Sequence, residues 1–281
     1  MSDLFGDGVP FEFIAAVFGV MAATPRHTYQ VLTKRPARML EFLAWLTEVA
    51  ADEFCGSRVD LALASAATHV NGDAWDRNLD RAGLAVEGGV WPLPNVWLGV
   101  SVENQAAADE RIPLLLQAPA AVRFLSCEPL LDWVNLGLLG TLPKTIAPQY
   151  TATYERLDWV IVGGESGPGA RPCDLAWLRS IVRQCSEAGV SVFVKQLGAH
   201  PLGVPPCIGC EGERFEGDRC ERCGDVVEVE TGRRVLHLKD RKGGDPAEWP
   251  EYLRLPMFHP PRPPRDPGPR LRRRARARSE E

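Results

Sequence analysis

The stretch Trp159–Pro172 reads WVIVGGESGPGARP, a short apolar run that passes directly into a glycine-rich turn. An amphipathic pattern follows at once, with apolar side chains three or four residues apart at Leu175, Leu178, Ile181, Val182 and Cys185. An apolar strand, a turn and an amphipathic helix form the repeating unit of parallel α/β sheets. Gly189 suits the C-terminal end of the helix. The stretch therefore predicts one strand–helix unit of such a sheet.

The same alternation recurs along the rest of the chain. Apolar runs predict strands over residues 29–33, 96–102, 122–126, 159–162 and 191–194. Helical spacing predicts helices over residues 11–21, 36–50, 105–116 and 175–188. Near-continuous apolar strands joined by helices are typical of a parallel sheet that is covered on both faces. With right-handed crossovers, the pattern predicts either an open doubly wound sheet or a barrel.

The sequence divides into a core and three smaller parts. The core covers residues 1–200, with an irregular excursion over about 52–94 that has room for one short helix; an insertion covers 201–232, a further strand and closing segment cover 233–259, and a tail covers 260–281. The tail holds eight Arg and three acidic residues, a net charge of +5, which leaves −10 on residues 1–259. Because this acidic body is unlike a DNA-binding domain, the Arg-rich tail is the part that suits nucleic acid. The alternative is a solvated, disordered terminus.

Neither a membrane span nor a secretory signal is visible in the sequence. No run of about 18 apolar residues occurs. The first residues, MSDLF, lack a basic stretch followed by an apolar one. We therefore expect a cytoplasmic protein with no membrane partner, in a compartment where cysteines stay reduced.

Charged residues follow the predicted strands. Lys34 and Arg35 follow the first strand, Glu103 the second, Glu128 the third and Lys195 the fifth. The C-terminal ends of parallel strands meet at one edge of a sheet or barrel, where the active sites of such folds lie. We therefore expect these five side chains to line one functional rim. Ordinary turn chemistry is the alternative for any one of them.

The fourth strand ends in the glycine-rich turn, at Gly163, Gly164, Glu165 and Ser166. This turn is neither a Walker loop nor a G-x-G-x-x-G fingerprint. Free N–H groups at a helix N-terminus favour a carboxylate or phosphate, and Glu165 can accept hydrogen bonds from an amine or a ribose. The alternative is a tight turn that needs glycine for positive φ angles. The residues leave both interpretations open.

Four of the eight cysteines form the pattern C-x2-C-x9-C-x2-C, at Cys207, Cys210, Cys220 and Cys223. Two C-x2-C turns can direct four thiolates at one ion, and a closed four-thiolate site is typical of structural zinc. We therefore expect a zinc ribbon in the 201–232 insertion, placed as a lid or as a contact for a protein partner. A pair of redox-active dithiols is the main alternative. The other cysteines are scattered and are typical of core thiols.

Several motifs, taken in order, resemble one known family. They are VLTKRP at 31–36, WLGVSVE at 97–103, LSCEPL at 125–130, VIVGGESG at 160–167, and DRKGGD at 240–245 followed by Trp249-Pro250. Over about residues 1–200 and 235–257, the chain resembles the phage-type family named after gene products thirty-seven and sixty-eight, a domain of unknown function.

That family is similar to the radical S-adenosylmethionine (SAM) enzymes. The resemblance implies a partial (β/α) barrel that binds a [4Fe–4S] cluster and SAM. It implies a SAM pocket lined by Gly163, Gly164, Glu165 and Ser166. It also implies that the pocket's rim carries Lys34, Arg35, Glu103, Glu128 and Lys195. The resemblance indicates no substrate.

One part of the family pattern is missing. Family members carry three closely spaced cysteines after their first strand, whereas residues 1–5 resemble the end of their second strand. As written, the chain is not expected to bind the cluster or to cleave SAM, because a cluster needs thiolate ligands. A misassigned start is favoured over a degenerate relative, since a missing strand leaves an uncovered sheet edge. We therefore expect a radical-SAM-like protein that is inactive as written. The alternative is a non-catalytic zinc-ribbon protein that contacts nucleic acid or a protein partner.

Overall fold

The computed structural model describes residues 3–52, 57–69, 90–138, 156–203 and 239–249, together with residues 215–216, 219–220, 234–235 and 253. Its centre is a sheet of five parallel strands, in the order β1 (Tyr29–Thr33), β2 (Val96–Ser101), β3 (Val122–Cys127), β4 (Trp159–Gly163) and β6 (Ser191–Gln196). Leu98 of β2 pairs with Val31 on one side and with Arg123 on the other. The predicted α/β fold with a parallel sheet is therefore confirmed.

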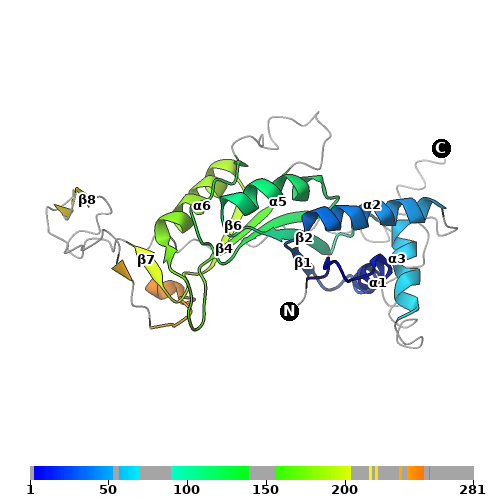
Figure 1. Cartoon of the computed structure of the whole chain (residues 1–281), viewed down its shortest axis with the longest axis horizontal. Helices are drawn as coiled ribbons and strands as arrows, with labels where there is room; N and C mark the ends of the chain where they lie inside the picture. The colour runs from blue at the N-terminus through cyan, green and yellow to red at the C-terminus, as the bar shows by residue number, and fades with distance from the viewer. Residues whose placement is uncertain are drawn as a thin grey trace, which may run out of the picture.

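The five strands lie side by side in chain order, so every crossover moves in the same direction. Right-handed crossovers in one direction place their helices on one face of a sheet. Accordingly α2 (Pro36–Asp52), α5 (Gln105–Gln117) and α6 (Leu175–Ala188) lie on the same side in Figure 1. The expectation of a doubly wound sheet is wrong, because double winding needs a reversal of strand order. Among the described residues β1 and β6 each pair with one strand only, so the sheet is open and closure into a barrel is not shown.

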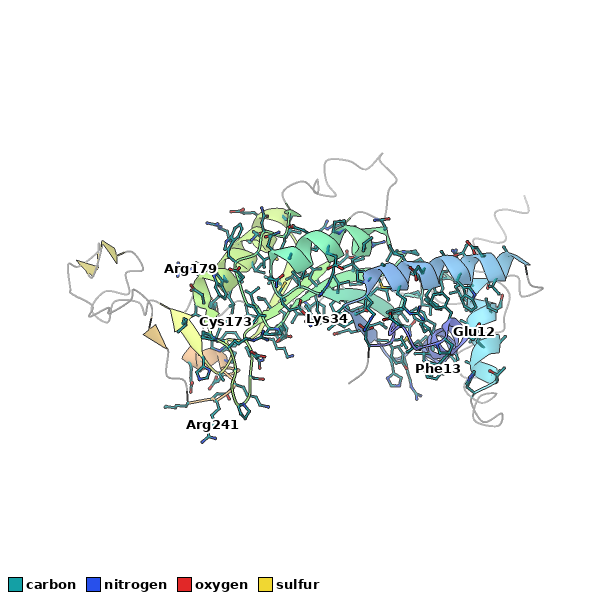
Figure 2. All side chains as sticks on the ribbon, viewed as in Figure 1. Glu12, Phe13, Lys34, Cys173, Arg179 and Arg241 are labelled. Atoms are coloured by element: carbon teal, nitrogen blue, oxygen red, sulfur yellow. The ribbon has the colours of Figure 1, made fainter. Side chains whose placement is uncertain are left out.

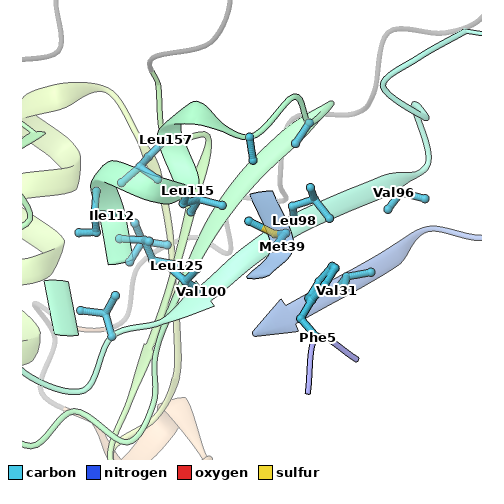
Figure 3. Packing of buried hydrophobic residues seen from close by; sticks show 14 of the residues in the cluster. Phe5, Val31, Met39, Val96, Leu98, Val100, Ile112, Leu115, Leu125 and Leu157 are labelled. Carbon is cyan, nitrogen blue, oxygen red and sulfur yellow. The ribbon is translucent and has the colours of Figure 1, made fainter. Parts of the chain in front are cut away.

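The main core lies between the sheet and its helices. Val100 and Leu125 point from the strands towards Ile112 and Leu115 of α5, and Leu98 lies further along β2 in the same layer (Figure 3). All five side chains are at most 8% exposed. Burial of apolar surface contributes roughly 25 cal/mol per Å². This layer therefore supplies much of the free energy that holds the helices on the sheet.

A smaller apolar cluster covers the opposite face of the sheet. It is formed by Trp97, Val122, Phe124 and Trp159, which are at most 7% exposed. Trp97 and Trp159 meet edge to face, with ring centroids 5.9 Å apart. A Cβ at Gly99 would lie 2.5 Å from the Phe124 ring, so glycine leaves the space that this ring occupies. Aromatic side chains thus fill the face that the helices do not cover.

Two helices form a packed pair beside the sheet: α1 (Phe11–Ala22) and α3 (Arg58–Ala67). The prediction of a helix over residues 11–21 is confirmed, and α3 falls within the excursion where one short helix was expected. Gly19 brings the two backbones together, because a Cβ there would lie 2.0 Å from the Ala62 carbonyl oxygen. Within the part of the chain that the structure describes, no helix has the length and apolar character needed to cross a membrane.

Side-chain hydrogen bonds cap the N-termini of two of the helices that pack on the sheet. The Asn104 side chain accepts from the Ala107 N–H at the start of α5, and Asp174 accepts from the Ala176 N–H at the start of α6. Gly189 ends α6 with φ at 63°, as its position in the sequence predicts. These caps place both helix starts directly after the C-terminal ends of strands.

A second, smaller sheet adjoins the end of β6. Its order is β10 (Arg234–Val235), β7 (Pro201–Gly203) and β5 (Cys173–Asp174). A two-stranded hairpin, β8 (Phe215–Glu216) with β9 (Arg219–Cys220), lies within the predicted insertion. β10 lies at the start of the strand expected near Val235.

The close contact at Gly19 predicts that a substitution which favours the helix will destabilise the fold. Gly19→Ala removes a flexible residue from α1, and on helix propensity alone this would stabilise the fold by about 1 kcal/mol. We expect a net loss of about 1–3 kcal/mol in the free energy of unfolding, because the new Cβ overlaps the Ala62 backbone. Urea unfolding measures the change. The matched control is Gly8→Ala, since nothing lies within 4 Å of a Cβ at Gly8; a stabilised Gly19→Ala variant would contradict this packing.

Candidate functional site

The first charged pair of the site joins the ends of β1 and β2. Lys34 forms an ion pair with Glu103, whose side chain is only 10% exposed. Arg111 of α5 donates from Nη1 to Glu103 Oε2 at 3.0 Å and to the Ser101 carbonyl oxygen at 2.8 Å. Figure 2 shows Lys34 on the side of the sheet away from α5. Glu103 is therefore held between one exposed and one half-buried cation.

The second charged pair spans two strands that are not neighbours. Lys195 of β6 donates to Glu128 Oε2 at 3.1 Å, and Glu128 follows β3. Strand β4 lies between them, and its residue at this level is Gly163. A Cβ at Gly163 would lie 2.8 Å from Glu128 Oε1. The absence of a side chain on Gly163 thus lets the Glu128 carboxylate lie across β4.

Four of the five side chains expected at one edge do lie along it in two pairs. We call Lys34, Glu103, Glu128 and Lys195 the strand-end rim. The two carboxylates are 10% and 14% exposed, whereas the lysine side chains are 57% and 54% exposed. In the rim, therefore, the negative charges are largely buried and the positive charges are exposed.

Arg35 does not join these pairs. It lies 3.7 Å from Asp3 Oδ2 and 3.6 Å from Asp7 Oδ1. The Asp3 carboxylate also accepts from the Thr33 hydroxyl at 2.8 Å and from the Lys34 N–H at 2.9 Å. Residues 3–5, expected to be the end of a strand, form part of a turn instead. Sequence reasoning missed Asp3, because a polar contact 30 residues along the chain leaves no local signal.

The Glu165 carboxylate forms hydrogen bonds within the glycine-rich turn itself. Arg171 donates to Glu165 from its backbone N–H at 2.9 Å, from Nε at 2.7 Å and from Nη2 at 3.0 Å. These hydrogen bonds lower the pKa of Glu165 to about 2. Ser166, also expected at the cofactor site, is exposed. In this structure Glu165 clamps the turn, and its oxygens already have donors.

The glycines of this turn are used for close backbone contact. A Cβ at Gly164 would lie 2.2 Å from the Leu197 carbonyl oxygen. The neighbouring Gly198 has φ at +91°, and Gly243 approaches it closely with φ at +65°. The Gly243 carbonyl oxygen accepts from the Leu197 N–H at 2.8 Å. These contacts favour the tight-turn interpretation and fasten residues 239–249 to the end of β6.

The described cysteines do not suit an iron–sulfur cluster. Cys127, Cys173 and Cys185 are buried and free. Burial raises the pKa of Cys173 and of Cys185 to about 12, and it raises that of Cys127 further. These three thiols lie on separate elements, β3, β5 and α6, and do not form the closely spaced set that a cluster needs. The structure contains no group of three or more metal-ligating side chains among the residues it describes.

The cysteine quartet falls outside this part of the structure. Cys207, Cys210 and Cys223 lie outside the described residues, and Cys220 is described only as backbone in β9. The Arg-rich tail over residues 260–281 also lies outside them. The expected zinc site and the expected nucleic-acid contact therefore stay predictions.

A cavity of about 330 Å³ lies away from the rim. Its lining comes from α5, from residues 135–138 and from Leu157. This places it beside α5, the helix on the covered face of the sheet, whereas the charged pairs lie at the strand ends. The charged side chains of the strand-end rim and this cavity thus lie in different parts of the structure.

Comparison with known proteins places the chain in a family. A family model described as "Protein of unknown function (DUF5131)" matches residues 1–240. The chain belongs to this family, whose description assigns no activity. Comparisons with curated proteins and with solved structures found no match.

The charge environment of Glu103 predicts how stability depends on pH. Burial acts to raise the pKa of Glu103, but the hydrogen bond from Lys34 and the charges of Arg111 and Lys34 outweigh it, so the pKa is lowered. A lowered carboxyl pKa stabilises the fold above the unfolded-state pKa, and this stabilisation is lost as pH falls through the folded-state pKa. We expect Glu103→Gln to cost about 1–3 kcal/mol at pH 7. The cost should shrink as pH falls below about 4.5.

Urea unfolding of both proteins at pH 7 and at pH 3.5 measures this difference. Glu187→Gln is the control, because Glu187 is 51% exposed and 4.0 Å from Arg183 on the surface of α6. Such exposed pairs contribute little to stability. A cost for Glu103→Gln that stays constant or grows on acidification would contradict the ion-pair arrangement.

Proposed function

We propose that this member of the DUF5131 family binds a small zwitterionic molecule, one that carries both an ammonium and a carboxylate group, at the strand-end rim. A single observation carries the proposal: two carboxylates at most 14% exposed, each paired with a lysine more than half exposed, at the ends of four strands. C-terminal strand ends of parallel sheets are where ligands of such folds bind.

The chemistry of the rim fits both charges of such a ligand. An ammonium group can replace a lysine on Glu103 or Glu128 and so keeps the carboxylate compensated. The ligand's carboxylate can then take the lysine that has been released. Charge-assisted hydrogen bonds of this kind are about twice as strong as neutral ones. The exchange needs no new buried charge, because each pair is replaced by an equivalent pair.

Within this class, SAM is the ligand that the family resemblance favours. Its methionine part carries one ammonium and one carboxylate group. The finer proposal is a radical-SAM-type enzyme of unknown substrate, in which a [4Fe–4S] cluster would supply the reductive cleavage of SAM. The described cysteines do not fit that cluster, so we assign no reaction step to this chain's residues.

A second candidate function rests on the cysteine pattern. The C-x2-C-x9-C-x2-C spacing supports a structural zinc ribbon in the insertion. Such a ribbon, together with the Arg-rich tail, would suit a non-catalytic protein that contacts nucleic acid or a protein partner. The two candidates differ in which part of the chain binds, so they can be tested separately.

The ligand proposal predicts that the full chain binds SAM in isothermal titration calorimetry. Glu128→Gln should weaken binding about tenfold or more, because it replaces a charge-assisted hydrogen bond. S-adenosylhomocysteine and methionine, which keep the ammonium and the carboxylate, should also bind.

The control variant for this titration is Lys242→Met. Lys242 is exposed, has no ion pair among the described residues, and is not one of the four rim residues. Its loss should leave the affinity unchanged. If wild-type chain binds none of the three compounds, or if Glu128→Gln binds SAM as well as wild type does, the rim is not the site.

The zinc proposal predicts about one zinc ion per chain after purification under reducing conditions. Cys207→Ser and Cys223→Ser should each lose the zinc, because a closed site needs all four thiolates. Cys185→Ala is the control, since Cys185 is a buried core thiol. Elemental analysis for zinc and iron measures the result; a chain without zinc, or with zinc retained by both serine variants, would rule out the ribbon.

A further inference from the structure

The two pairs of the strand-end rim differ in how firmly the carboxylate is held. Glu103 has a second cation, because Arg111 donates to its Oε2 at 3.0 Å and is itself only 16% exposed. The Glu103 backbone is also fixed, since its carbonyl oxygen accepts from the Leu131 N–H at 2.9 Å. If Lys34 swings into solvent, Glu103 therefore remains paired.

Within the part of the chain that the structure describes, Glu128 has no such second cation. Lys195 binds its Oε2 at 3.1 Å, and nothing in the described part of the chain donates to its Oε1, which is buried. If Lys195 leaves, the carboxylate is left largely buried without a partner, which costs free energy. Lys195 is therefore displaced only when another cation takes its place.

The surroundings of Glu128 suit a group that donates several hydrogen bonds. Gly163 places no side chain beneath the carboxylate. Ser126, two residues before Glu128, lies on the same face of β3 and pairs in register with Ser101 of β2. Neither serine hydroxyl has a hydrogen-bond partner among the described residues. Two serines and a carboxylate oxygen without a donor thus lie close together, at the rim carboxylate that has a single cation among the described residues.

We propose that Glu128 is the residue that binds the cationic group of the ligand, that Lys195 occupies this position in the free protein, and that the site selects an ammonium or guanidinium group. Glu103, held by Arg111, serves as a fixed counter-charge. The inference rests on the proposed function, because it assigns the two halves of the same rim.

Removal of an ordinary binding residue weakens ligand binding, whereas removal of Lys195 should strengthen it. Lys195→Met removes the competitor for Glu128 and should tighten binding of methioninamide, which has an ammonium group and no carboxylate. The expected gain is about two- to fivefold, the range of an exposed ion pair. Glu128→Gln should abolish most of this binding. Titration calorimetry on the full chain measures both affinities.

Two comparisons make the result specific. Lys34→Met should tighten methioninamide binding less than Lys195→Met does, since Glu103 keeps Arg111. Lys242→Met, which leaves all four rim residues in place, should leave the affinity unchanged. For the desamino compound 4-(methylthio)butanoate, which has a carboxylate and no ammonium, Lys195→Met should not tighten binding, because this compound has no cation to pair with Glu128.

The outcomes separate the inference from the proposed function. If SAM and methionine bind the wild-type chain but Lys195→Met leaves methioninamide binding unchanged or weaker, the inference fails and the rim remains the site. If Lys34→Met gives the larger gain, the two halves are assigned the wrong way round. If neither SAM, methionine nor methioninamide binds the wild-type chain or Lys195→Met, the proposed function fails and the inference fails with it.

Discussion

The single direction of winding is the constraint on which the rest of this structure depends. Each crossover carries the chain to the next strand on the same side, so α2, α5 and α6 share one face of the sheet. The other face carries aromatic side chains along the strands and charged side chains at their ends. At this end of the sheet Lys34 reaches the end of the neighbouring strand β2, and Lys195 reaches across β4 to the end of β3. The charged site is thus a consequence of how the chain is wound.

The burial of two carboxylates explains the residues that surround them. A buried carboxylate needs compensating charge or hydrogen bonds. For Glu103, α5 supplies that charge through Arg111. For Glu128 it comes from Lys195, which is possible only because Gly163 leaves the strand between them bare. The rim is therefore held by features from both faces of the sheet, and the two halves carry different amounts of positive charge.

Much of the fold was predictable from the sequence, and the site only in outline. The five strands follow from apolar runs, and the end of α6 follows from Gly189, because both are local signals. The alternation of charged residues after strands indicated Lys34 and Glu103 at one edge. The role of Arg111 was not predictable, since it depends on the side of the sheet on which α5 lies. Glu165 looked equally suited to a ligand and to its own turn, and its hydrogen bonds with Arg171, which favour the turn, could not be read from the sequence.

The reach of Lys195 over β4 has a mechanical consequence. Strand β6 is the outer strand of the sheet and is bonded to β4, while its lysine is tied to the strand beyond. This ion pair links β3 to β6 across β4, in addition to the hydrogen bonds between neighbouring strands. A ligand that takes the place of Lys195 would break this link, so the free and the ligand-bound forms would differ in how β3 and β6 are joined.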